Sequence, residues 1–347
     1  MKKFLLVLLL LLIALVAFVL YIFNSTGFFR EVVQKNDFGV IHGQIDLPGV
    51  EDIALARVDS LLILSVDDRA TRREGKSGPT GIYLVELRNP AFEPVDLTQD
   101  LDFPFFPHGI SLYQTDSAAY SLAVINHVDG EHSVEIFHLR GKSLTHQKTI
   151  RDENFISPND LVLVSPDQFY YSNDHGYRSG IGVFAENYLG LKASNVGFFD
   201  GEKVEIKAEG IGYANGIQFD LTNKTLYVAA VRSFSVLVYS VDENWNLNLD
   251  EELDAGTGVD NIELDDAGTL WIGAHPNLLR FASYAAGKEE TAPSEVLKIS
   301  YENGQSKIES VYTDTGEKVS GSSVAVPWGD YLFIGNVMDS KVLILKK

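Results

Sequence analysis

Apolar and polar positions along the chain repeat as a pair of short strands joined by a turn. In one copy, the polar pair Asn159-Asp160 precedes an apolar run, Ser-Pro-Asp follows at 165–167, and an aromatic-rich run begins at Gln168. Proline presets the φ angle that a turn needs, and aspartate bonds its own backbone there. This stretch therefore predicts a β-hairpin that begins with a polar pair.

The hairpin pattern occurs six times in all, and its second strands begin near residues 61, 120, 168, 225, 269 and 331. Successive second strands are 44 to 62 residues apart. A repeat of roughly 40–60 residues with several short strands is typical of a β-propeller, in which each repeat forms one blade. The pattern predicts an all-β fold, a six-bladed β-propeller over residues 38–347.

The segments outside the hairpins carry weaker patterns. We expect a first strand at 38–47 to close the ring by pairing with the last strand, at 341–346. The charged stretch 67–78 predicts a solvated loop, and the insert at 178–200 predicts a short amphipathic helix near the rim. Residues 281–295 are expected to form another exposed connection.

The N-terminus differs in composition from the rest of the chain. Twenty uncharged residues, 4–23, follow two lysines, and at about 1.5 Å per residue they span about 30 Å, one bilayer core. A cleaved signal peptide is the alternative, but its apolar run has about 7–15 residues and ends at small residues. Here the run ends in bulky Tyr21-Ile22-Phe23. We predict an uncleaved transmembrane signal-anchor.

This anchor implies an arrangement of the whole chain. The lysines before the span predict a cytoplasmic N-terminus at residues 1–3, a single-pass membrane location and a propeller on the non-cytoplasmic side. Residues 24–37 are then a linker between the span and the propeller.

Composition excludes several classes of site. The 347 residues include 28 Lys and Arg, 48 Asp and Glu and no cysteine, for a formal net charge of −20. Disulfides, thiolate catalysis and cysteine-type zinc sites are therefore excluded. Nucleic acid is not expected as a partner, because phosphate neutralisation needs Lys and Arg. Most of the acidic charge fits a solvated surface, and part of it fits bound cations.

The polar residues that begin the hairpins are expected to meet. If the hairpins are equivalent, these residues lie at the same end of one strand in every blade and form a ring around the central channel. Carboxylate and amide oxygens are hard ligands that suit Ca²⁺, which takes about 6–8 oxygens. The ring consists of Glu51, Asp52, His108, Asn159, Asp160, Asn215, Asp260, Asn261, Ser322 and Ser323.

Four of the eight histidines belong to this pattern. His108 is in the ring, whereas His127, His175 and His275 end the second strands of their hairpins or lie just beyond them. For each one alone a structural histidine is the favoured explanation, and the recurrence at corresponding strand ends weakens it for His108 and His127. Beside a calcium ion, however, a neutral histidine can activate water near pH 7 while the ion polarises a carbonyl. Ester or lactone hydrolysis needs these parts and no covalent nucleophile, and the chain has no Gly-x-Ser-x-Gly elbow.

Seven short motifs in the same order carry a resemblance to a known family. They are Pro-His-Gly-Ile-Ser at 107–111, Val-Ile-Asn-His at 124–127, Asn-Asp-Leu-Val at 159–162, Ser-Asn-Asp-His at 172–175, Ala-Asn-Gly-Ile at 214–217, Val-Asp-Asn-Ile at 259–262 and Trp-Ile-Gly-Ala-His-Pro-Asn at 271–277. From about Glu51 to the C-terminus the chain resembles the paraoxonases, a family of serum arylesterases and lactonases.

The resemblance implies a six-bladed propeller with two calcium ions and a retained hydrophobic N-terminus. It implies that His108 and His127 form a dyad that activates water, with Asp260 as an alternative base. It places Tyr213 and His275 in the substrate pocket, where we also expect His175, with its role left open. The implied ligands of the catalytic calcium are Glu51, Asn159, Asn215, Asp260 and Asn261, and those of the structural calcium are Asp52, Asp160 and the backbone carbonyl of Ile110.

The chain departs from the family in one respect. Animal paraoxonases join their first and last strands by a disulfide, whereas this chain has Val40 and Ile344 near those places. Closure of its ring must rest on strand hydrogen bonds and apolar packing.

Together these patterns predict a membrane-anchored, calcium-dependent hydrolase of small-molecule lactones and aryl esters. Two alternatives stay open. One is a non-catalytic propeller that calcium stabilises and that binds a partner. The other is a gluconolactonase-like enzyme, with a polar, sugar-sized pocket and one divalent ion.

Overall fold

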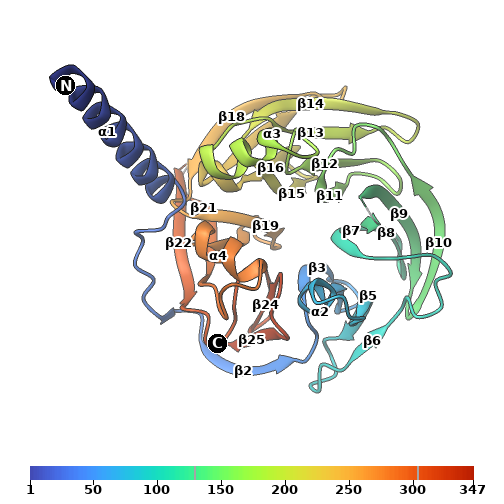
Figure 1. Cartoon of the computed structure of the whole chain (residues 1–347). Helices are drawn as coiled ribbons and strands as arrows, with labels where there is room; N and C mark the ends of the chain where they lie inside the picture. The colour runs from blue at the N-terminus through green and yellow to red at the C-terminus, as the bar shows by residue number, and fades with distance from the viewer. Residues whose placement is uncertain (129, 303–304) are drawn as a thin grey trace.

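The computed structural model describes residues 1–128, 130–302 and 305–347, and it is a six-bladed β-propeller (Figure 1). Six antiparallel sheets surround a central channel, and each inner strand contacts the inner strands of both neighbouring blades. The second strands begin at residues 61, 119, 169, 225, 270 and 331, each within one residue of its predicted position. The predicted fold class is therefore confirmed.

Each blade runs outward from its first strand. Blade one contains β3 (Val50–Ala56), β4 (Leu61–Asp67), β5 (Thr80–Glu86) and β6 (Pro94–Asp96). Blade two contains β7 (Pro107–Asp116), β8 (Ala119–Val128), β9 (Glu131–Arg140) and β10 (Ser143–Ile150). Blade three contains β11 (Pro158–Leu163), β12 (Phe169–Asn173), β13 (Ser194–Phe199) and β14 (Val204–Ile211).

Blades four to six follow the same plan, with two additions from the N-terminal segment. Blade four contains β15 (Ala214–Asp220), β16 (Thr225–Ala230), β17 (Ser235–Val241) and β18 (Leu247–Asp254). Blade five contains β19 (Gly258–Leu264), β20 (Leu270–His275), β21 (Ser294–Glu302), β22 (Gln305–Asp314) and the short β1 (Lys35–Asn36). Blade six contains β23 (Ser322–Trp328), β24 (Tyr331–Asn336), β25 (Val342–Lys346) and β2 (Val40–Ile45).

The apolar core lies between the blades. The alternating apolar residues of the strands form six buried clusters, and each cluster joins one pair of consecutive blades. In blade one, for example, Leu62 and Leu64 face blade six, whereas Ile63 faces blade two. This follows from the period of two along a strand, which sends successive side chains to opposite faces of the sheet.

The ring closes where the sequence predicts. β2 pairs with β25 in antiparallel register, with Val40 opposite Lys346 and Gly43 opposite Ile344. Ile344 is buried in the cluster between blades six and one, so hydrogen bonds and apolar packing close the ring together.

Several connections are more ordered than the sequence indicates. The loop at 67–78 contains α2 (Arg69–Arg73), and α4 (Leu278–Ala285) extends into the connection at 281–295. The insert at 178–200 holds the expected helix as α3 (Ile181–Phe184) and a π-helical turn, η1 (Ala185–Leu189), but its last part is β13, a buried strand. A 3-10 turn, η2 (Val231–Ser233), follows β16.

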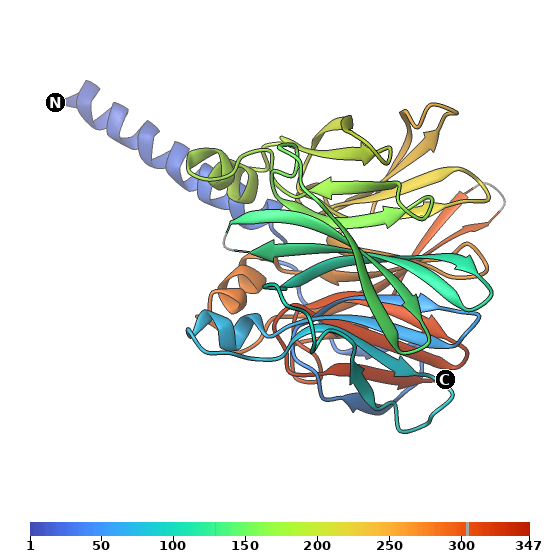
Figure 2. The ribbon, with the colours of Figure 1, turned by 90° about the vertical axis from the view of Figure 1, so that its right-hand side faces the viewer.

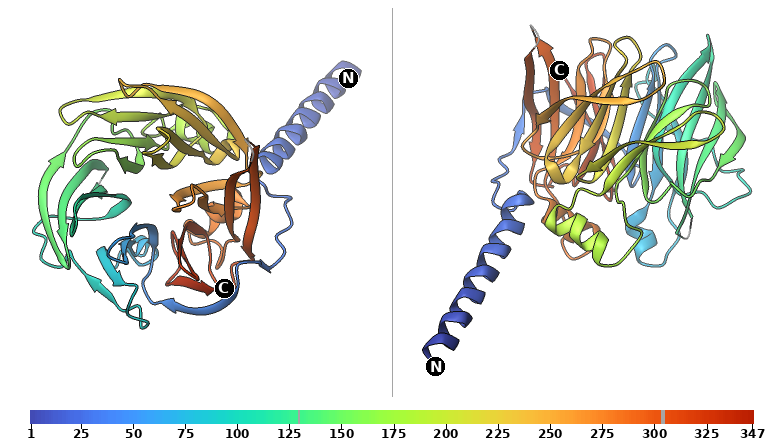
Figure 3. Two further views of the ribbon diagram at one scale, coloured as in Figure 1. Left: turned by 180° about the vertical axis from the view of Figure 1, so that it is seen from behind. Right: turned by 90° about the horizontal axis from the view of Figure 1, so that it is seen from above.

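The N-terminal helix α1 (Lys2–Ser25) projects away from the ring (Figure 3). By length and composition it could cross a membrane, with a mean hydropathy of 3.4 over its most apolar window, and a signal sequence would meet the same criteria. The segment after it is bound to the propeller, because β1 pairs with β22 and Arg30 forms an ion pair with the buried Glu295 at 2.7 Å. The predicted linker 24–37 is thus partly built into blade five.

The inner strands share a local irregularity. In all six blades the register between the first and second strands shifts at the polar residues that begin the hairpin. Such a bulge turns the side chains of a strand away from strict alternation. Consecutive polar residues can therefore both point toward the channel.

Candidate active site

The polar ring lies between two cavities on the propeller axis. The first, here called the helix-side cavity, has a volume of about 370 Å³ and is lined by Glu51, Asn159 and Asp260 together with residues of η1 and α4. The second, the far-side cavity, has a volume of about 390 Å³ and is lined by Asp52 and Asp160. Figure 2 shows that the helices gather on one face of the propeller. The two members of a polar pair thus face different cavities.

Five ring residues carry a buried oxygen without a hydrogen-bond partner. Each has one side-chain oxygen, shielded from solvent, that accepts no hydrogen bond from any described residue. Buried polar atoms are normally satisfied, so such atoms together indicate a missing partner. These are Oε2 of Glu51 and the Oδ1 atoms of Asn159, Asn215, Asp260 and Asn261, the residues that the resemblance assigns to the catalytic calcium.

Hydrogen bonds to neighbouring groups orient some of these oxygens. The Asn261 amide nitrogen donates to Oε1 and to the backbone carbonyl of Glu51, at 2.9 and 3.0 Å, which leaves Oδ1 of Asn261 free. The Asn159 amide is within 3.4 Å of Asp174. His275 Nε2 donates to Oδ2 of Asp260 at 2.7 Å, which leaves Oδ1 of that carboxylate free. The free oxygens are held in place before any ion binds.

Two glycines allow the inner strands to approach this closely. A Cβ on Gly109 would lie 2.5 Å from Cα of Asp160, and one on Gly216 would lie 2.6 Å from Cα of Asn261. Only a residue without a side chain fits at such a distance. This explains why His108 and Asn215 are each followed by glycine.

Three carboxylates of the ring, those of Glu51, Asp52 and Asp160, are buried, and the positive charge near them is too small to keep their pKa values in the usual range. Burial raises the pKa of Glu51 well above its usual value, and the charge of Asp260 raises it further. Burial also raises the pKa of Asp52 to about 7 and that of Asp160 well above the usual range, against the hydrogen bonds that each accepts. A cation bound among these groups would remove this cost.

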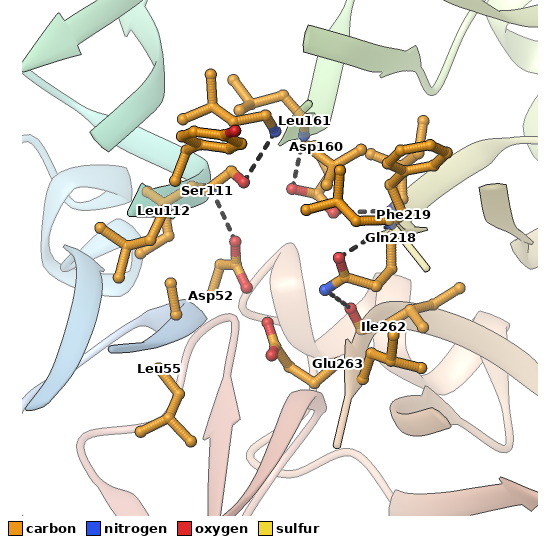
Figure 4. Close-up of a pocket in the computed structure, with 18 of the residues that line it drawn as sticks. Asp52, Leu55, Ser111, Leu112, Asp160, Leu161, Gln218, Phe219, Ile262 and Glu263 are labelled. Carbon is orange, nitrogen blue, oxygen red and sulfur yellow. Dashed lines mark hydrogen bonds between the residues drawn. The ribbon is translucent and has the colours of Figure 1, made fainter. Parts of the chain in front are cut away.

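The far-side cavity is shown in Figure 4. The Asp52 carboxylate accepts hydrogen bonds from the backbone N–H groups of Ile53 and Ile110, at 2.8 and 2.7 Å. Asp160 accepts from Leu161 and Ile217, at 2.7 and 2.8 Å. Each carboxylate therefore ties its own blade to the next one. Ile110 lines this cavity with both, and its described hydrogen bond to Asp52 uses its N–H.

His108 lies at the edge of the helix-side cavity, between two charged groups. Its Nε2 is 3.6 Å from Oε1 of Glu51, and its Nδ1 is 3.4 Å from the Arg69 guanidinium. Burial and the charge of Arg69 hold the pKa of His108 well below its usual value. The ring is consequently neutral at physiological pH.

His127 lies beside His108 but bonds to another histidine. The two rings have centroids 4.9 Å apart. The hydrogen bond of His127 joins its Nδ1 to Nδ1 of His132 at 2.8 Å. Burial, together with the positive charges of His132 and Arg69, lowers the pKa of His127 to about 3. The structure thus brings the predicted dyad together and adds a third ring.

Tyr213 borders the site, and His175 packs against it. Their ring centroids are 4.8 Å apart, and Tyr213 lines the helix-side cavity from a left-handed backbone conformation with φ of 63°. His175 bonds to Asp174 at 2.6 Å and to Asn187 at 3.0 Å. Burial opposes the charged form of His175, but Asp174 prevails and raises its pKa to about 9. His175 is therefore a cation beside Tyr213.

The roof of the helix-side cavity is largely apolar. Phe281 of α4 stacks on His275, with ring centroids 3.7 Å apart, and Leu278 and Leu279 line the cavity beside it. Thr26, just after α1, is also a lining residue, and its backbone carbonyl accepts a hydrogen bond from the Leu278 N–H at 3.0 Å. The end of the N-terminal helix therefore borders the site.

Four residues of the site were not predicted from the sequence. Asp174 stands inside the Ser-Asn-Asp-His motif and Arg69 inside the charged loop, but neither position indicates which ring residue it contacts. Phe281 belongs to a connection expected to be exposed. His132 could have been found from the sequence, because it lies only five residues after His127, and the two face each other across β8 and β9.

The candidate shell depends on asparagine. Within the described part of the chain, no three histidine, aspartate or glutamate side chains are grouped so that they alone could hold a metal ion. The amide oxygens of Asn159, Asn215 and Asn261 supply the rest of the donor set, and neutral and charged oxygens together suit calcium.

Comparison with known proteins agrees with this architecture. The family model described as Arylesterase matches residues 31–344. Serum paraoxonase/arylesterase 1 of Mus musculus is 37% identical over 269 residues, which cover 75% of each chain. Serum paraoxonase/arylesterase 2 of Gallus gallus is 35% identical over 266 residues, again 75% of each chain.

Among solved structures, a luciferin-regenerating enzyme superposes with a TM-score of 0.56 at 13% identity. The match covers 91% of this chain and 96% of the other, and it shows a common fold. The family match and the two relatives decide the classification: the chain belongs to the arylesterase family of hydrolases, together with the serum paraoxonases.

Proposed function

We propose that this member of the arylesterase family hydrolyses lactones and aryl esters with the help of calcium held by the polar ring. One observation carries the proposal. Each of the five predicted ligands of the catalytic ion has a buried side-chain oxygen without a hydrogen-bond partner among the described residues. Four of the five residues line the cavity that could receive a substrate. The two-sided arrangement of the ring further supports a second, structural ion beside Asp52 and Asp160.

A calcium ion held by these five ligands would act as a Lewis acid: it would polarise the ester carbonyl and stabilise the negative charge that develops on its oxygen. Glu51 and Asp260 supply the negative charge that retains the ion, and the three asparagines complete the shell with neutral oxygens. Because Oδ2 of Asp260 already accepts a hydrogen bond from His275, this carboxylate is less suited to act as the general base.

Proton transfer falls to the histidines in this proposal. His108 is neutral and adjoins Glu51, so a water molecule near the ion would lie within its reach. Arg69 opposes a lasting positive charge on His108, so the proton must move on. His127, in contact with His108, is the next acceptor.

The lining of the helix-side cavity favours apolar substrates. Val231, Leu278, Leu279, Phe281 and Ala282 are apolar residues of this lining. Aryl esters and lactones with aliphatic chains would bury apolar surface there. A sugar lactone would need hydrogen-bond partners for several hydroxyl groups, which these residues do not offer.

For localisation we propose that α1 anchors the protein in a membrane, with the propeller on the non-cytoplasmic side. The helix is exposed along its length, and two lysines precede it. Membranes from cells that express the full chain should retain it after alkaline extraction, and protease added outside should digest the propeller. Release by alkali, or protection of the propeller from the protease, would contradict this placement.

The activity is tested with the full chain in detergent. Phenyl acetate and an aliphatic δ-lactone are supplied in buffer that contains calcium, then with a calcium chelator, then with calcium restored. We expect hydrolysis that the chelator abolishes and calcium recovers. A folded protein that binds calcium yet hydrolyses neither substrate would support the non-catalytic propeller instead.

A further inference from the structure

A third histidine, His132, stands on the solvent side of His127. β8 and β9 are adjacent antiparallel strands whose register sets His127 directly opposite His132. The two Nδ1 atoms are 2.8 Å apart, and the rings meet edge to face with centroids 4.7 Å apart. Contact of this kind follows from strand pairing and does not depend on a mobile loop.

The remaining nitrogens of the pair have different surroundings. Nε2 of His127 is buried and has no hydrogen-bond partner among the described residues. His132 is half-buried, and its Nε2 is not among the side-chain atoms that are shielded from solvent without a partner. The pair therefore connects a secluded nitrogen beside His108 to the outside of the propeller.

The short contact between the Nδ1 atoms restricts the protonation states. One Nδ1 must carry a hydrogen and the other a lone pair, because two donors or two acceptors would repel each other. Burial lowers the pKa of both rings, so both are neutral near pH 7. When the His127 Nδ1–H donates to His132, Nε2 of His127 is left with a free lone pair.

We propose that His132 is a positioning and proton-relay residue of this hydrolase: it holds His127 in the form that can accept a proton and passes that proton to solvent. The inference rests on the proposed function, since it supposes that His108 and His127 handle the proton of the attacking water.

The proton count balances without any further reactant. A proton that arrives at Nε2 of His127 displaces the Nδ1 proton to Nδ1 of His132, and the Nε2 proton of His132 leaves to solvent. When the leaving alkoxide takes a proton from Nε2 of His127, the same steps run in reverse and restore both rings. The proton that the carboxylic acid product loses passes to solvent.

Charged groups around the pair come from two segments, the connection between β12 and β13 and helix α2. Arg178 lowers and Asp174 raises the pKa of His132, and both belong to the connection between β12 and β13. His127 faces the same Asp174 and also Arg69 and Arg72 of α2. The cations outweigh the single carboxylate, so neither ring retains a proton for long.

Two variants of the full chain test the relay, one that keeps a hydrogen-bond acceptor at this position and one that does not. His132→Asn keeps a hydrogen-bond acceptor near the position of Nδ1 but cannot transfer a proton. His132→Ala removes both functions and leaves space for added imidazole. We expect kcat to fall about tenfold in each variant, below the usual range for loss of a general base because His108 and His127 remain. KM should stay unchanged, and imidazole should restore kcat in the alanine variant.

The matched control is His138→Asn, on the same strand and also half-buried, which should retain wild-type kcat. Calcium-dependent melting of every variant verifies the fold. An active wild type with unchanged kcat in both His132 variants would overturn this inference alone, as would loss without rescue by imidazole. An inactive wild type would instead overturn the proposed function.

A readout independent of activity accompanies the kinetics. In histidine-labelled ¹⁵N spectra, the Nδ1-bound proton shared by His127 and His132 should be protected from exchange in the wild type. It should disappear in His132→Ala. An exchange-labile or absent signal in the wild type would contradict the pair even if activity were normal.

Discussion

At the scale of single residues, the site is organised by which atom of each side chain is already occupied. Asn261 uses its amide nitrogen, Asp260 uses one oxygen and His127 uses one nitrogen, and in each case the other atom is left free. Half-satisfied side chains of this kind are costly when buried, and they cluster at functional sites. The free atoms, more than the residue types, define what the site can bind.

The first prediction concerns the histidine dyad. His108→Gln and His127→Gln each remove a ring that can accept a proton, so we expect kcat to fall by about 10²-fold or more. Calcium affinity should be retained, because neither residue belongs to the five-oxygen shell. Steady-state kinetics with phenyl acetate and calcium titration calorimetry measure the two effects. Full activity in the double variant would exclude a role for the dyad.

The second prediction concerns stability and pH at His175. Its pKa is raised to about 9 against about 6.5 in an unfolded chain, so its contribution is complete below pH 6.5 and disappears as the pH rises through 9. His175→Asn should therefore reduce the free energy of unfolding by up to about 3 kcal/mol at pH 6.

Near pH 10 the same substitution should reduce the free energy of unfolding much less. Urea unfolding of the full chain at both pH values, at constant calcium, gives the difference. The exposed His42→Asn serves as the control and should behave alike at both. An equal loss at pH 6 and pH 10 for His175→Asn would contradict the ion pair with Asp174.

At the scale of elements, the inner strand of each blade carries the design. It begins with a bulge that turns polar side chains toward the axis, and in blades two and four it passes so close to the next inner strand that a glycine is required. The bulge lets Asn159 face one cavity and Asp160 the other, although they are consecutive. The same local irregularity thus serves both candidate ion positions.

The third prediction tests this close approach. A Cβ at Gly216 would lie 2.4 Å from the backbone oxygen of Asp260, which cannot move without shifting two predicted ligands. Gly216→Ala should cost about 3 kcal/mol of stability and weaken calcium binding. Gly43→Ala, where a Cβ meets nothing within 4 Å, is the control. Denaturant unfolding and calcium titration of both variants decide the matter, and a neutral Gly216→Ala would contradict the packing described.

The sequence predicts the blades and the polar ring, but it does not predict several side-chain contacts of the site, for physical reasons. The hairpin repeat and its polar pairs are local patterns, so the sequence alone indicates six blades and a polar ring. The orientation of His127 toward His132, and of Arg69 toward His108, depends on strand register and on the path of α2. The strand β13 was hidden because its short apolar run follows a helical insert.

At the scale of the whole molecule, the negative net charge favours the binding of a cation such as calcium. The chain carries a formal charge of −20, and several of its carboxylates converge on the axis, where burial keeps water from screening them. A cation bound at the centre would remove this repulsion between the blades. Calcium is therefore expected to hold the ring together as well as to assist the reaction.

The fourth prediction follows from this. Ions that bind only the folded state stabilise it by about 4 kcal/mol when their concentration is a thousand times the dissociation constant. A calcium chelator should therefore lower the melting temperature of the full chain by several degrees, and calcium should restore it. Magnesium should restore little, because it demands a smaller octahedral shell. A melting curve that ignores the chelator would exclude calcium from the axis.

The segment between α1 and β2 connects the apolar helix to the strand that closes the ring. Ser25, the last residue of α1, accepts a hydrogen bond from Arg232. Beyond it, Arg30 pairs with Glu295 and β1 lies along β22. If a membrane pulls on α1, the force reaches blades four and five through these contacts before it reaches the pairing of β2 with β25. The pairing of β2 with β25 then carries less of the force. A propeller whose ring is closed without a disulfide can therefore be anchored without separation of its first and last strands.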